Sequence, residues 1–431
     1  MPFEERSSAA KSIVVIGGGI SGMGAAYHLA ETSRVVLLES ASRLGGHART
    51  VVAGKNGDQP VDTGFIVFNH RNYPHLTKLF ADLDVPTVPS KMSFGVSARG
   101  GRLEYGLADA DTILAQRSNV ARPQFLRMIR DIVRFNSKAD EIATPNMTIG
   151  QLISVLGLGA WFRDYYLTPF SGAIWSTPTA QILDFPARAM IEFFKNHGLL
   201  GYYGDPQWFT VKGGSIEYVT RLGAAMRSRG VDVRLGAQVQ AVRRTAYGVE
   251  VRLNGGEWEA FDEVVFATHS DDTLGLLSDA NGAERNALSA IRYQPNRAVL
   301  HCDASVMPKR RKVWSSWSYV DTGKSPDDPI VLSYWMNSLQ PIPQEDPMFV
   351  TLNRTAPIRE ELIYDEAEFR HPVYDLAAFA AQDQLRAMNG RNKTWFCGAW
   401  MKNGFHEDGL GSAMDVVQAM SAPGQMAVAA E

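Results

Sequence analysis

Residues 12 to 30, SIVVIGGGISGMGAAYHLA, decide the fold of this chain. The β-branched run SIVVI is typical of a strand buried on both faces of a parallel sheet. Glycines at 17, 19 and 22 follow at once with the spacing G-x-G-x-x-G, and the helix formers MGAAYHLA come next, from Met23 to Ala30. Strand, glycine-rich turn and helix in this order predict the opening of a dinucleotide-binding domain.

The next strand supplies an acid at the right distance. Arg34 to Leu38 is again β-branched and ends at Glu39, about twenty residues after the first glycine. In this motif Gly17 permits the tight turn, Gly19 lets the backbone approach a pyrophosphate, and Gly22 lets the helix pack on the sheet. The other predicted nucleotide contacts are Ile20 and Ser21 at the helix start, and Glu39 and Ser40 at a ribose. An acid at the ribose argues against NADP.

Composition excludes several classes of protein. The 431 residues allow roughly two to three domains, and a net charge of -3 makes nucleic acid an unlikely partner. Cys302 and Cys397 are too few for a disulfide framework and fit a reducing compartment. The charged start, MPFEERSS, lacks a signal-peptide core, and a strand, turn and helix explain the uncharged run from Ile13 to Ala30 better than a membrane span does. We therefore expect a cytoplasmic protein without a metal site.

A resemblance to a known family distinguishes FAD from NAD. Arg43-Leu44-Gly45-Gly46-His47 resembles the R-x-G-G-R stretch of the flavin amine oxidase and phytoene desaturase superfamily, with His47 in place of the last arginine. In that superfamily the segment runs along the FAD pyrophosphate and ribityl chain. Asp62-Thr63-Gly64-Phe65 is similar to the next landmark, where the chain returns beside the flavin. The resemblance implies non-covalently bound FAD.

Three later segments are similar to the same family. The resemblance places Val239 beside the adenine and Ala267 at a second approach to the pyrophosphate. Gly398 ends a C-terminal strand, and the stretch from Gly404 to Ala413 then opens a helix whose N-terminus would point at the flavin. The family's usual acid is replaced by Ala399. Glu407 or Asp408 is the candidate replacement, and Gly409 and Leu410 complete the predicted cofactor contacts.

These landmarks imply an α/β fold (α+β overall) with a discontinuous, Rossmann-like FAD-binding domain. We expect that domain to comprise residues 1–90, 208–270 and 390–431. Residues 91–207 and 271–389 should then form an inserted, amine-oxidase-like substrate domain with a mixed sheet and helices.

The first insert contains an amphipathic helix, expected from Pro123 to Ala143. Its apolar stripe comprises Phe125, Leu126, Ile129, Ile132 and Val133, and Arg127, Arg130, Arg134 and Lys138 lie elsewhere. Periodicity favours a core-facing helix with a solvated basic face. The alternative is a face that contacts anionic lipid headgroups, which would make the protein peripheral at the inner membrane face.

Aromatic residues are dense in both inserts and are candidates for an apolar substrate channel. The first set is Trp161, Phe162, Tyr165, Tyr166, Phe170, Trp175, Phe193, Phe194, Tyr202, Tyr203, Trp208 and Phe209. The second is Trp314, Trp317, Tyr319, Tyr334 and Trp335. Plain core packing would also explain such a density.

Several blocks, including Phe65 to Asn69, Ser171 to Ser176 and Trp208 to Ser215, resemble one branch of the superfamily more closely. That branch is the flavin-dependent fatty acyl dehydrogenases (desaturases) of methylated furan fatty acid biosynthesis, associated with lipid methyltransferases. The resemblance implies dehydrogenation of a methyl-branched unsaturated acyl chain, held in a phospholipid, by hydride transfer to flavin N5.

The proton acceptor is open among three residues: His197, His406 and Glu407. Each also has a structural explanation, because buried histidines commonly serve as hydrogen-bonding core residues. One alternative function is an amine oxidase, which would need a lysine near the flavin, and Lys212 is a candidate with an equally good surface role. The other is a non-catalytic flavoprotein partner of a lipid methyltransferase.

Overall fold

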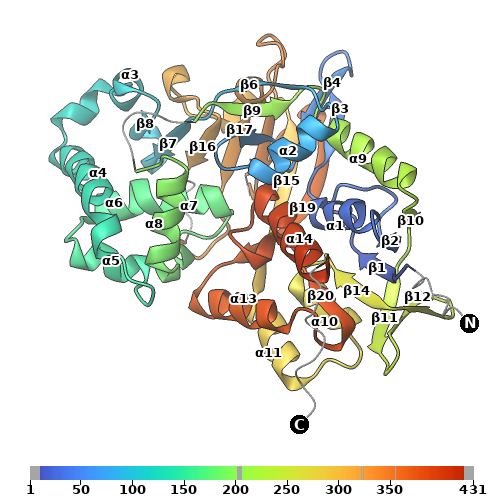
Figure 1. The fold of residues 1–431 in the computed structure, drawn as a ribbon. Helices are drawn as coiled ribbons and strands as arrows, with labels where there is room; N and C mark the ends of the chain where they lie inside the picture. Colours follow the sequence, from blue (N-terminus) through green and yellow to red (C-terminus); the bar gives the residue numbers. More distant parts are fainter. Residues whose placement is uncertain (1–9, 201–205, 322, 324, 355, 422–431) are drawn as a thin grey trace, which may run out of the picture.

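The computed structural model describes residues 10–200, 206–321, 323, 325–354 and 356–421. Figure 1 shows two parts side by side: α/β layers on the right and a cluster of helices, α3 to α8, on the left. The expected aromatics Tyr202 and Tyr203 lie outside the described residues. No described helix is long and apolar enough to cross a membrane.

A parallel five-stranded sheet organises the right-hand part, with the strand order β10-β2-β1-β14-β20. The strands are β1 (Ser12–Ile16), β2 (Arg34–Glu39), β10 (Asp232–Leu235), β14 (Glu263–Phe266) and β20 (Thr394–Phe396). The last four residues of β1 are buried, as the apolar run predicts. Helix α1 (Ile20–Leu29) begins three residues earlier than its composition suggests, because Gly19 is its N-cap and the glycine pattern forms its first turn.

Both faces of this sheet are covered. On one face the core contains side chains of α1, α2 (Pro74–Asp82), α9 (Ile216–Ser228) and α14 (His406–Ser421). The core on the other face takes side chains from a three-stranded sheet and from three helices. These elements are β11 (Val239–Arg244), β12 (Val249–Leu253), β13 (Trp258–Phe261), α10 (Ser270–Leu276), α11 (Gly282–Ala290) and α13 (Leu376–Met388).

The last three helices were expected in the substrate domain. Side chains of α10, α11 and α13 also pack against the nucleotide-binding sheet. The motifs mark where the cofactor contacts lie, and they carry no information about which neighbouring helices complete that core.

The second large sheet is mixed and has seven strands, in the order β19-β15-β18-β17-β16-β7-β8. They are β7 (Phe94–Ala98), β8 (Leu103–Gly106), β15 (Arg292–His301), β16 (Trp317–Val320), β17 (Leu332–Trp335), β18 (Phe349–Leu352) and β19 (Ile363–Val373). Only the β16–β7 pair is parallel. The smaller elements are β3 (Thr50–Ala53), β4 (Gln59–Asp62), β5 (Val67–Asn69), β6 (Thr87–Ser90), β9 (Trp208–Val211), α3 (Ala110–Ile113) and α12 (Met336–Leu339).

The helical part packs around an aromatic core of its own. It contains α4 (Pro123–Ile142), α5 (Ile149–Val155), α6 (Ala160–Phe162), α7 (Thr168–Trp175) and α8 (Ala187–Asn196). The buried face of α4 differs from the predicted stripe: Phe125 and Ile132 are buried, but Leu126 is 51% and Val133 48% exposed. Met128 and Phe135 take their places, because the buried positions follow 125, 128, 132 and 135 around the helix.

Candidate active site

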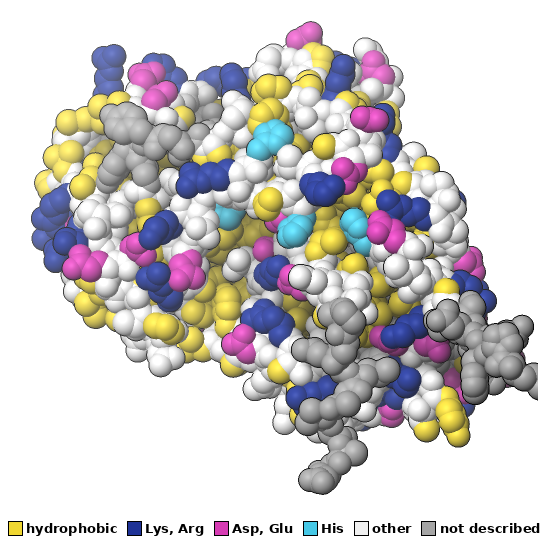
Figure 2. All heavy atoms as spheres, in the orientation of Figure 1, with side chains coloured by type: hydrophobic (Ala, Val, Ile, Leu, Met, Phe, Trp, Pro, Cys, Tyr) yellow, Lys and Arg dark blue, Asp and Glu magenta, His cyan; other side chains and the backbone are white. Residues whose placement is uncertain are grey.

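One cavity of about 1530 Å³ joins the two parts of the molecule. It starts at the glycine-rich turn after β1, passes the loop at Gly45 to His47, and ends among α4, α7 and α8. In Figure 2 the hollow between the two parts shows hydrophobic side chains, with histidines around it. The cavity therefore has a polar end lined by backbone and an apolar end lined by side chains.

The glycine turn has the geometry that a dinucleotide requires. Gly17 adopts a φ of 107°, and a Cβ at Gly22 would lie 1.8 Å from the Gly17 carbonyl oxygen, so neither position accepts a side chain. A Cβ at Gly19 would meet no protein atom within 4 Å, although Gly19 lines the cavity. As the N-cap of α1 it provides no side-chain hydrogen bond, which leaves the first helical N–H groups for an anion.

Glu39 closes this end of the cavity. Its Oε2 accepts a hydrogen bond from Gly18 N (2.5 Å), and its Oε1 accepts from Ala41 N (2.7 Å) and Ser40 Oγ (3.2 Å). Two of these donors are backbone N–H groups, so the carboxylate is fixed in place at the cavity wall. A carboxylate held in this way keeps lone pairs for a ribose hydroxyl.

Most of the cofactor residues predicted from sequence line the cavity. They are Gly17, Gly19, Ile20, Ser21, Glu39, Ser40, Gly45, Gly46, His47, Thr63, Gly64, Phe65, Val239, Ala267 and Gly398. Five others do not line it: Gly22, Arg43, Asp408, Gly409 and Leu410. Gly22 lies against the Gly17 carbonyl oxygen and so allows α1 to approach the turn.

Arg43 requires a correction. Its guanidinium donates hydrogen bonds to the carbonyl oxygens of Leu44, Gly46 and Ala48, at 2.8–3.2 Å. The side chain therefore shapes the loop that faces the cavity and does not itself line it. Arg49, the other nearby cation, is bound to Asp365.

The C-terminal helix also differs from the prediction. Glu407, a proposed base, accepts hydrogen bonds from the backbone N–H groups of His75 and Leu76 (2.9 Å each) and so caps α2. Asp408 is half-buried and accepts a hydrogen bond from Phe405 N (2.9 Å), and desolvation raises its pKa to about 6. Leu410 packs on Gly24, and Gly409 lies against Ser21. These residues fix α14 to its neighbours.

Four histidines border the cavity near the loop at residues 45–48. Burial lowers the pKa of His47 to about 4, and that of His269, His371 and His406 to about 3 each. All four imidazoles are consequently neutral at neutral pH. Nε2 of His47 is buried and has no hydrogen-bond partner.

The two histidines proposed as bases differ in their partners. The His406 ring stacks on Phe65 (3.9 Å between centroids), and its Nε2 lies 2.6 Å from the Tyr218 hydroxyl. Because burial raises the pKa of Tyr218 and no other partner of this hydroxyl is found in the described residues, the phenol donates to Nε2. His197 instead donates from Nδ1 to the Phe193 carbonyl oxygen (2.9 Å), which leaves the lone pair on Nε2.

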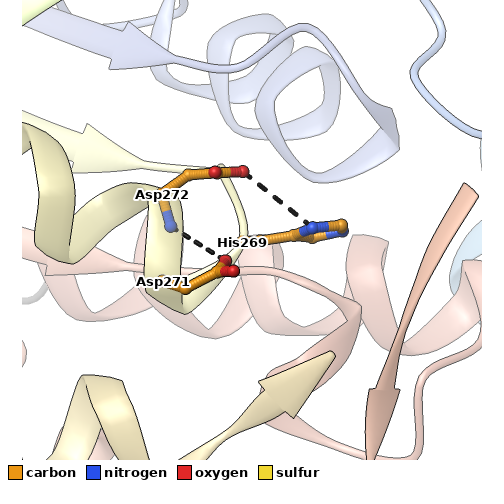
Figure 3. A group of neighbouring side chains, drawn as sticks. All are labelled: His269, Asp271 and Asp272. Atoms are coloured by element: carbon orange, nitrogen blue, oxygen red, sulfur yellow. Dashed lines mark hydrogen bonds and ion pairs between the residues drawn. The ribbon is translucent and has the colours of Figure 1, made fainter. Parts of the chain in front are cut away.

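A cluster of charged side chains lies in the cavity wall between the nucleotide-binding sheet and β19. Figure 3 shows His269, Asp271 and Asp272 at the start of α10, with His269 Nδ1 4.0 Å from Asp272 Oδ2. Arg370, from β19, binds Asp271 at 2.7 Å and also pairs with Asp272. The guanidinium therefore already compensates both carboxylates, and we assign no cation to them.

Sequence reasoning missed the residues that β19 and the start of α10 contribute: Phe369, Arg370, His371, Asp271 and Asp272 all line the cavity. Histidine or arginine in a strand carries no motif, and only the pairing of β19 with β15 brings these side chains to the cavity. Of the expected channel aromatics, Tyr166, Phe170, Trp175, Phe193, Trp208, Trp317 and Tyr334 line it, whereas Phe162 and Phe194 are core residues.

Comparison with known proteins identifies the family. The model of the family described as flavin containing amine oxidoreductase matches residues 20–337. The chain belongs to this family. It is an FAD-dependent oxidoreductase, and the site fits that cofactor: the open side of Gly19, the free N–H groups of α1 and the unpartnered His47 Nε2 all face or adjoin the cavity.

Curated relatives match over short stretches. Human protoporphyrinogen oxidase is 52% identical over 50 residues, which are 11% of this chain and 10% of that protein. The FAD-dependent oxidoreductase oblC of Cochliobolus heterostrophus is 32% identical over 92 residues, 21% of this chain and 18% of that protein. The chain thus matches less than a fifth of the length of these relatives.

Solved structures show the same fold over almost the whole chain. A fatty acid isomerase from P. acnes that produces CLA superposes with a TM-score of 0.66 and 14% identity, covering 96% of this chain and 99% of that one. Cyclohexylamine oxidase from Brevibacterium oxydans superposes with a TM-score of 0.68 and 15% identity, covering 96% and 100%. At such identities the likeness establishes the fold alone.

Proposed function

We propose that the protein dehydrogenates a methyl-branched unsaturated fatty acyl chain, held in a phospholipid, to a diene. The observation that carries this proposal is the apolar end of the cavity. Its described lining is mostly aromatic and aliphatic, with Phe94, Ile129, Phe170, Ile174 and Trp317 among the contributors. Its polar members include Asn136, Ser176 and His197, and it includes no lysine, arginine or carboxylate. Burying an acyl chain against such a wall is favourable by about 25 cal/mol for each Å² of apolar surface.

An amine substrate fits this end less well. It would need a carboxylate or another group to hold an ammonium ion, and the charged residues in the described lining, Glu39, Asp271, Asp272 and Arg370, lie at the nucleotide end or in ion pairs. Lys212, the candidate lysine for an amine oxidase, is exposed and outside the described lining. The fold neighbours include an enzyme named for a fatty acid as well as one named for an amine.

His197 is our candidate for the proton acceptor. The chemistry that bound FAD supplies is acceptance of a hydride from a substrate carbon, and forming the double bond also requires loss of a proton from the neighbouring carbon. His197 lines the cavity, burial lowers its pKa, and its Nδ1–H bond to Phe193 leaves Nε2 free to accept that proton. His406 is occupied by Tyr218 and is proposed to position the site.

The direct test is anaerobic reduction of the holoenzyme. We expect vesicles of a phospholipid that carries a methyl-branched monounsaturated acyl chain to bleach the flavin absorbance. Cyclohexylamine and putrescine should leave it unchanged. Rapid bleaching by an amine with none by the lipid would replace this proposal by amine oxidation.

A second measurement concerns the base. His197→Ala should slow reduction of the flavin by about 10²-fold or more, with lipid and FAD still bound. His406→Ala serves as the matched variant, since it removes a cavity histidine whose acceptor atom is already engaged. Equal rates for wild type and His197→Ala would remove His197 from the reaction and leave the reaction class intact.

We also propose that the edge formed by α3 and α4 contacts an anionic membrane surface. Leu114, Val120, Leu126 and Val133 are 44–51% exposed there, and Val133 also lines the cavity. Arg127 and Arg134 are exposed on the same helix, without an ion pair among the described contacts. Apolar side chains beside unpaired arginines match an interface with anionic headgroups, at a point where a lipid chain would enter.

Vesicle sedimentation tests this contact. Binding to phosphatidylglycerol vesicles should exceed binding to phosphatidylcholine vesicles and weaken with salt. Arg127→Gln with Arg134→Gln should reduce it by about thirtyfold, at roughly 1 kcal/mol for each arginine. Arg71→Gln with Arg391→Gln, which removes two exposed arginines elsewhere, is the control. Equal binding to neutral vesicles at high salt would contradict the proposal.

A further inference from the structure

A pair of asparagine side chains, one of them fully buried, holds one cavity histidine in place. His371, on β19, lies opposite Gln294 of β15 and lines the cavity. Its Nδ1 lies 3.2 Å from Nδ2 of Asn296, a residue with no exposed surface. Asn296 in turn receives a hydrogen bond at Oδ1 from Nδ2 of Asn353 (2.7 Å). None of these three residues, Asn296, Asn353 and His371, belongs to a motif visible in the sequence.

The orientation of both amides follows from backbone groups. Oδ1 of Asn353 accepts from Arg297 N (3.0 Å), and its Nδ2 donates to the Ile330 carbonyl oxygen (3.2 Å). Reversing this amide would oppose donor to donor and acceptor to acceptor. Because Asn353 Nδ2 is thus a donor, the Asn296 atom that faces it must be the oxygen.

The same reasoning extends to the histidine. With its oxygen assigned, Asn296 presents Nδ2 to two groups, the Gln294 carbonyl oxygen (3.0 Å) and His371 Nδ1. Because the amide N–H of Asn296 donates to Nδ1, that nitrogen must carry a lone pair. The proton of the neutral ring is therefore on Nε2. Protonating Nδ1 would set two donors against each other inside the protein.

The charged and titratable groups around His371 do not change this assignment. His47 lies 5.6 Å away between ring centroids and is neutral at neutral pH, so burial is what lowers the pKa of His371 there. His269 is also neutral, and the neighbouring Arg370 is paired with Asp271 and Asp272. Within the described residues no carboxylate contacts the His371 ring.

We infer that His371 is a fixed hydrogen-bond donor, through Nε2–H, to the ring system of bound FAD, and that it is a positioning residue and not a base. It shares its part of the cavity with His47 and with His406, which stacks on Phe65. A donor beside the flavin favours the reduced ring, which is richer in electrons, and therefore raises its reduction potential. This role is the same for an acyl or an amine substrate, so its failure would leave the proposed function untouched.

The tautomer itself is observable without turnover. Long-range proton–nitrogen NMR correlations of histidine-labelled holoenzyme report which ring nitrogen carries the proton, and the His371→Gln spectrum assigns the signal. We expect the Nε2–H form, unchanged from pH 6 to pH 8. An Nδ1–H form, or a ring protonated on both nitrogens, would overturn the inference.

The reduction potential tests the donor. His371→Leu should shift the reduction equilibrium by about tenfold toward oxidised flavin, which is about 30 mV for two electrons. His371→Gln should restore most of the wild-type potential, because its amide N–H can replace Nε2–H. A potential unchanged in His371→Leu, or equally lowered in the Leu and Gln variants, would overturn the inference.

A further variant acts through the tautomer alone. Asn296→Asp replaces the donor by an acceptor, which draws the proton to Nδ1 and leaves a lone pair on Nε2. We expect the potential to fall and its pH dependence near neutrality to exceed that of the wild type, because the carboxylate raises the pKa of His371. A pH dependence equal to that of the wild type would contradict the inference. His75→Gln, at an exposed histidine, is the control.

Discussion

The two ends of the cavity are built in different ways. At the nucleotide end the protein surface is mostly backbone: Gly17 and Gly22 accept no side chain, and Gly19 leaves open space beside it. At the apolar end the surface consists of side chains such as Ile129, Phe170 and Trp175, from helices that pack around their own core. A backbone-lined site therefore depends on residue identity, whereas a side-chain-lined site depends on shape and tolerates replacement.

The largest expected difference lies within the glycine motif. Gly22→Ala places a methyl group 1.8 Å from the Gly17 carbonyl oxygen, so we expect loss of folded protein or a destabilisation of more than about 3 kcal/mol. Gly19→Ala meets no protein atom, and it should fold normally yet retain little FAD, because its methyl group occupies the cavity. Thermal unfolding and flavin content measure the two effects. A stable, yellow Gly22→Ala protein would break the comparison.

The histidines at the junction of the two ends predict a pH dependence. The folded-state pKa values of His47, His269, His371 and His406, about 3–4, lie below the ordinary value of 6.5. As pH falls below 6.5, the unfolded chain binds these protons first, so the free energy of unfolding decreases by roughly 1.4 kcal/mol per pH unit for each histidine.

Two carboxyl groups act in the opposite direction. Burial raises the pKa of Asp62 and Asp408 to about 6, so protonation below pH 6 favours the folded state until the unfolded carboxyls titrate near 3.8. Four histidines outweigh two carboxyls, and the melting temperature should fall between pH 6.5 and pH 4. His371→Gln should reduce that slope. A melting temperature that rises on acidification would contradict the assignment of neutral histidines.

A smaller effect is expected at Glu39. Glu39→Ala removes the acceptor for Gly18 N and Ala41 N together with the proposed ribose contact, and FAD binding should weaken by about 1–2 kcal/mol. Glu39→Gln retains one acceptor oxygen and should lose less. Titration of the apoprotein with FAD measures both, and equal affinity in all three proteins would remove Glu39 from the cofactor site.

The smallest effect is expected at the apolar end. Phe170→Leu keeps an apolar side chain in the cavity wall, so KM for the lipid substrate should rise only a few-fold, within about 1.5 kcal/mol, at unchanged flavin content. Steady-state kinetics with the acyl substrate test this tolerance. A loss of bound FAD in this variant would show that the two ends are not independent.

The nucleotide end could be predicted from the sequence because its function restricts the backbone. Positions such as Gly17 and Gly22 admit one residue type, and that restriction is written into the chain as a spacing. The partners of Arg43 and Glu407 could not be predicted for a related reason. Each motif gives the position of a charged side chain and not its partner. The Arg43 side chain binds nearby carbonyl groups between Leu44 and Ala48, and the Glu407 side chain binds N–H groups at the start of α2.

In the sequence, local strand, turn and helix signals predicted the glycine-lined nucleotide end of the site, and the resemblance of later segments such as Arg43 to His47 implied the family and the FAD cofactor. The remaining contacts depend on how distant strands pair. His371, Asn296 and Asn353 meet because β19 and β18 pair with β15, although Asn296 and His371 are 75 residues apart in the chain. Strand pairing over such separations depends on the packing of the whole sheet, and no local pattern encodes it.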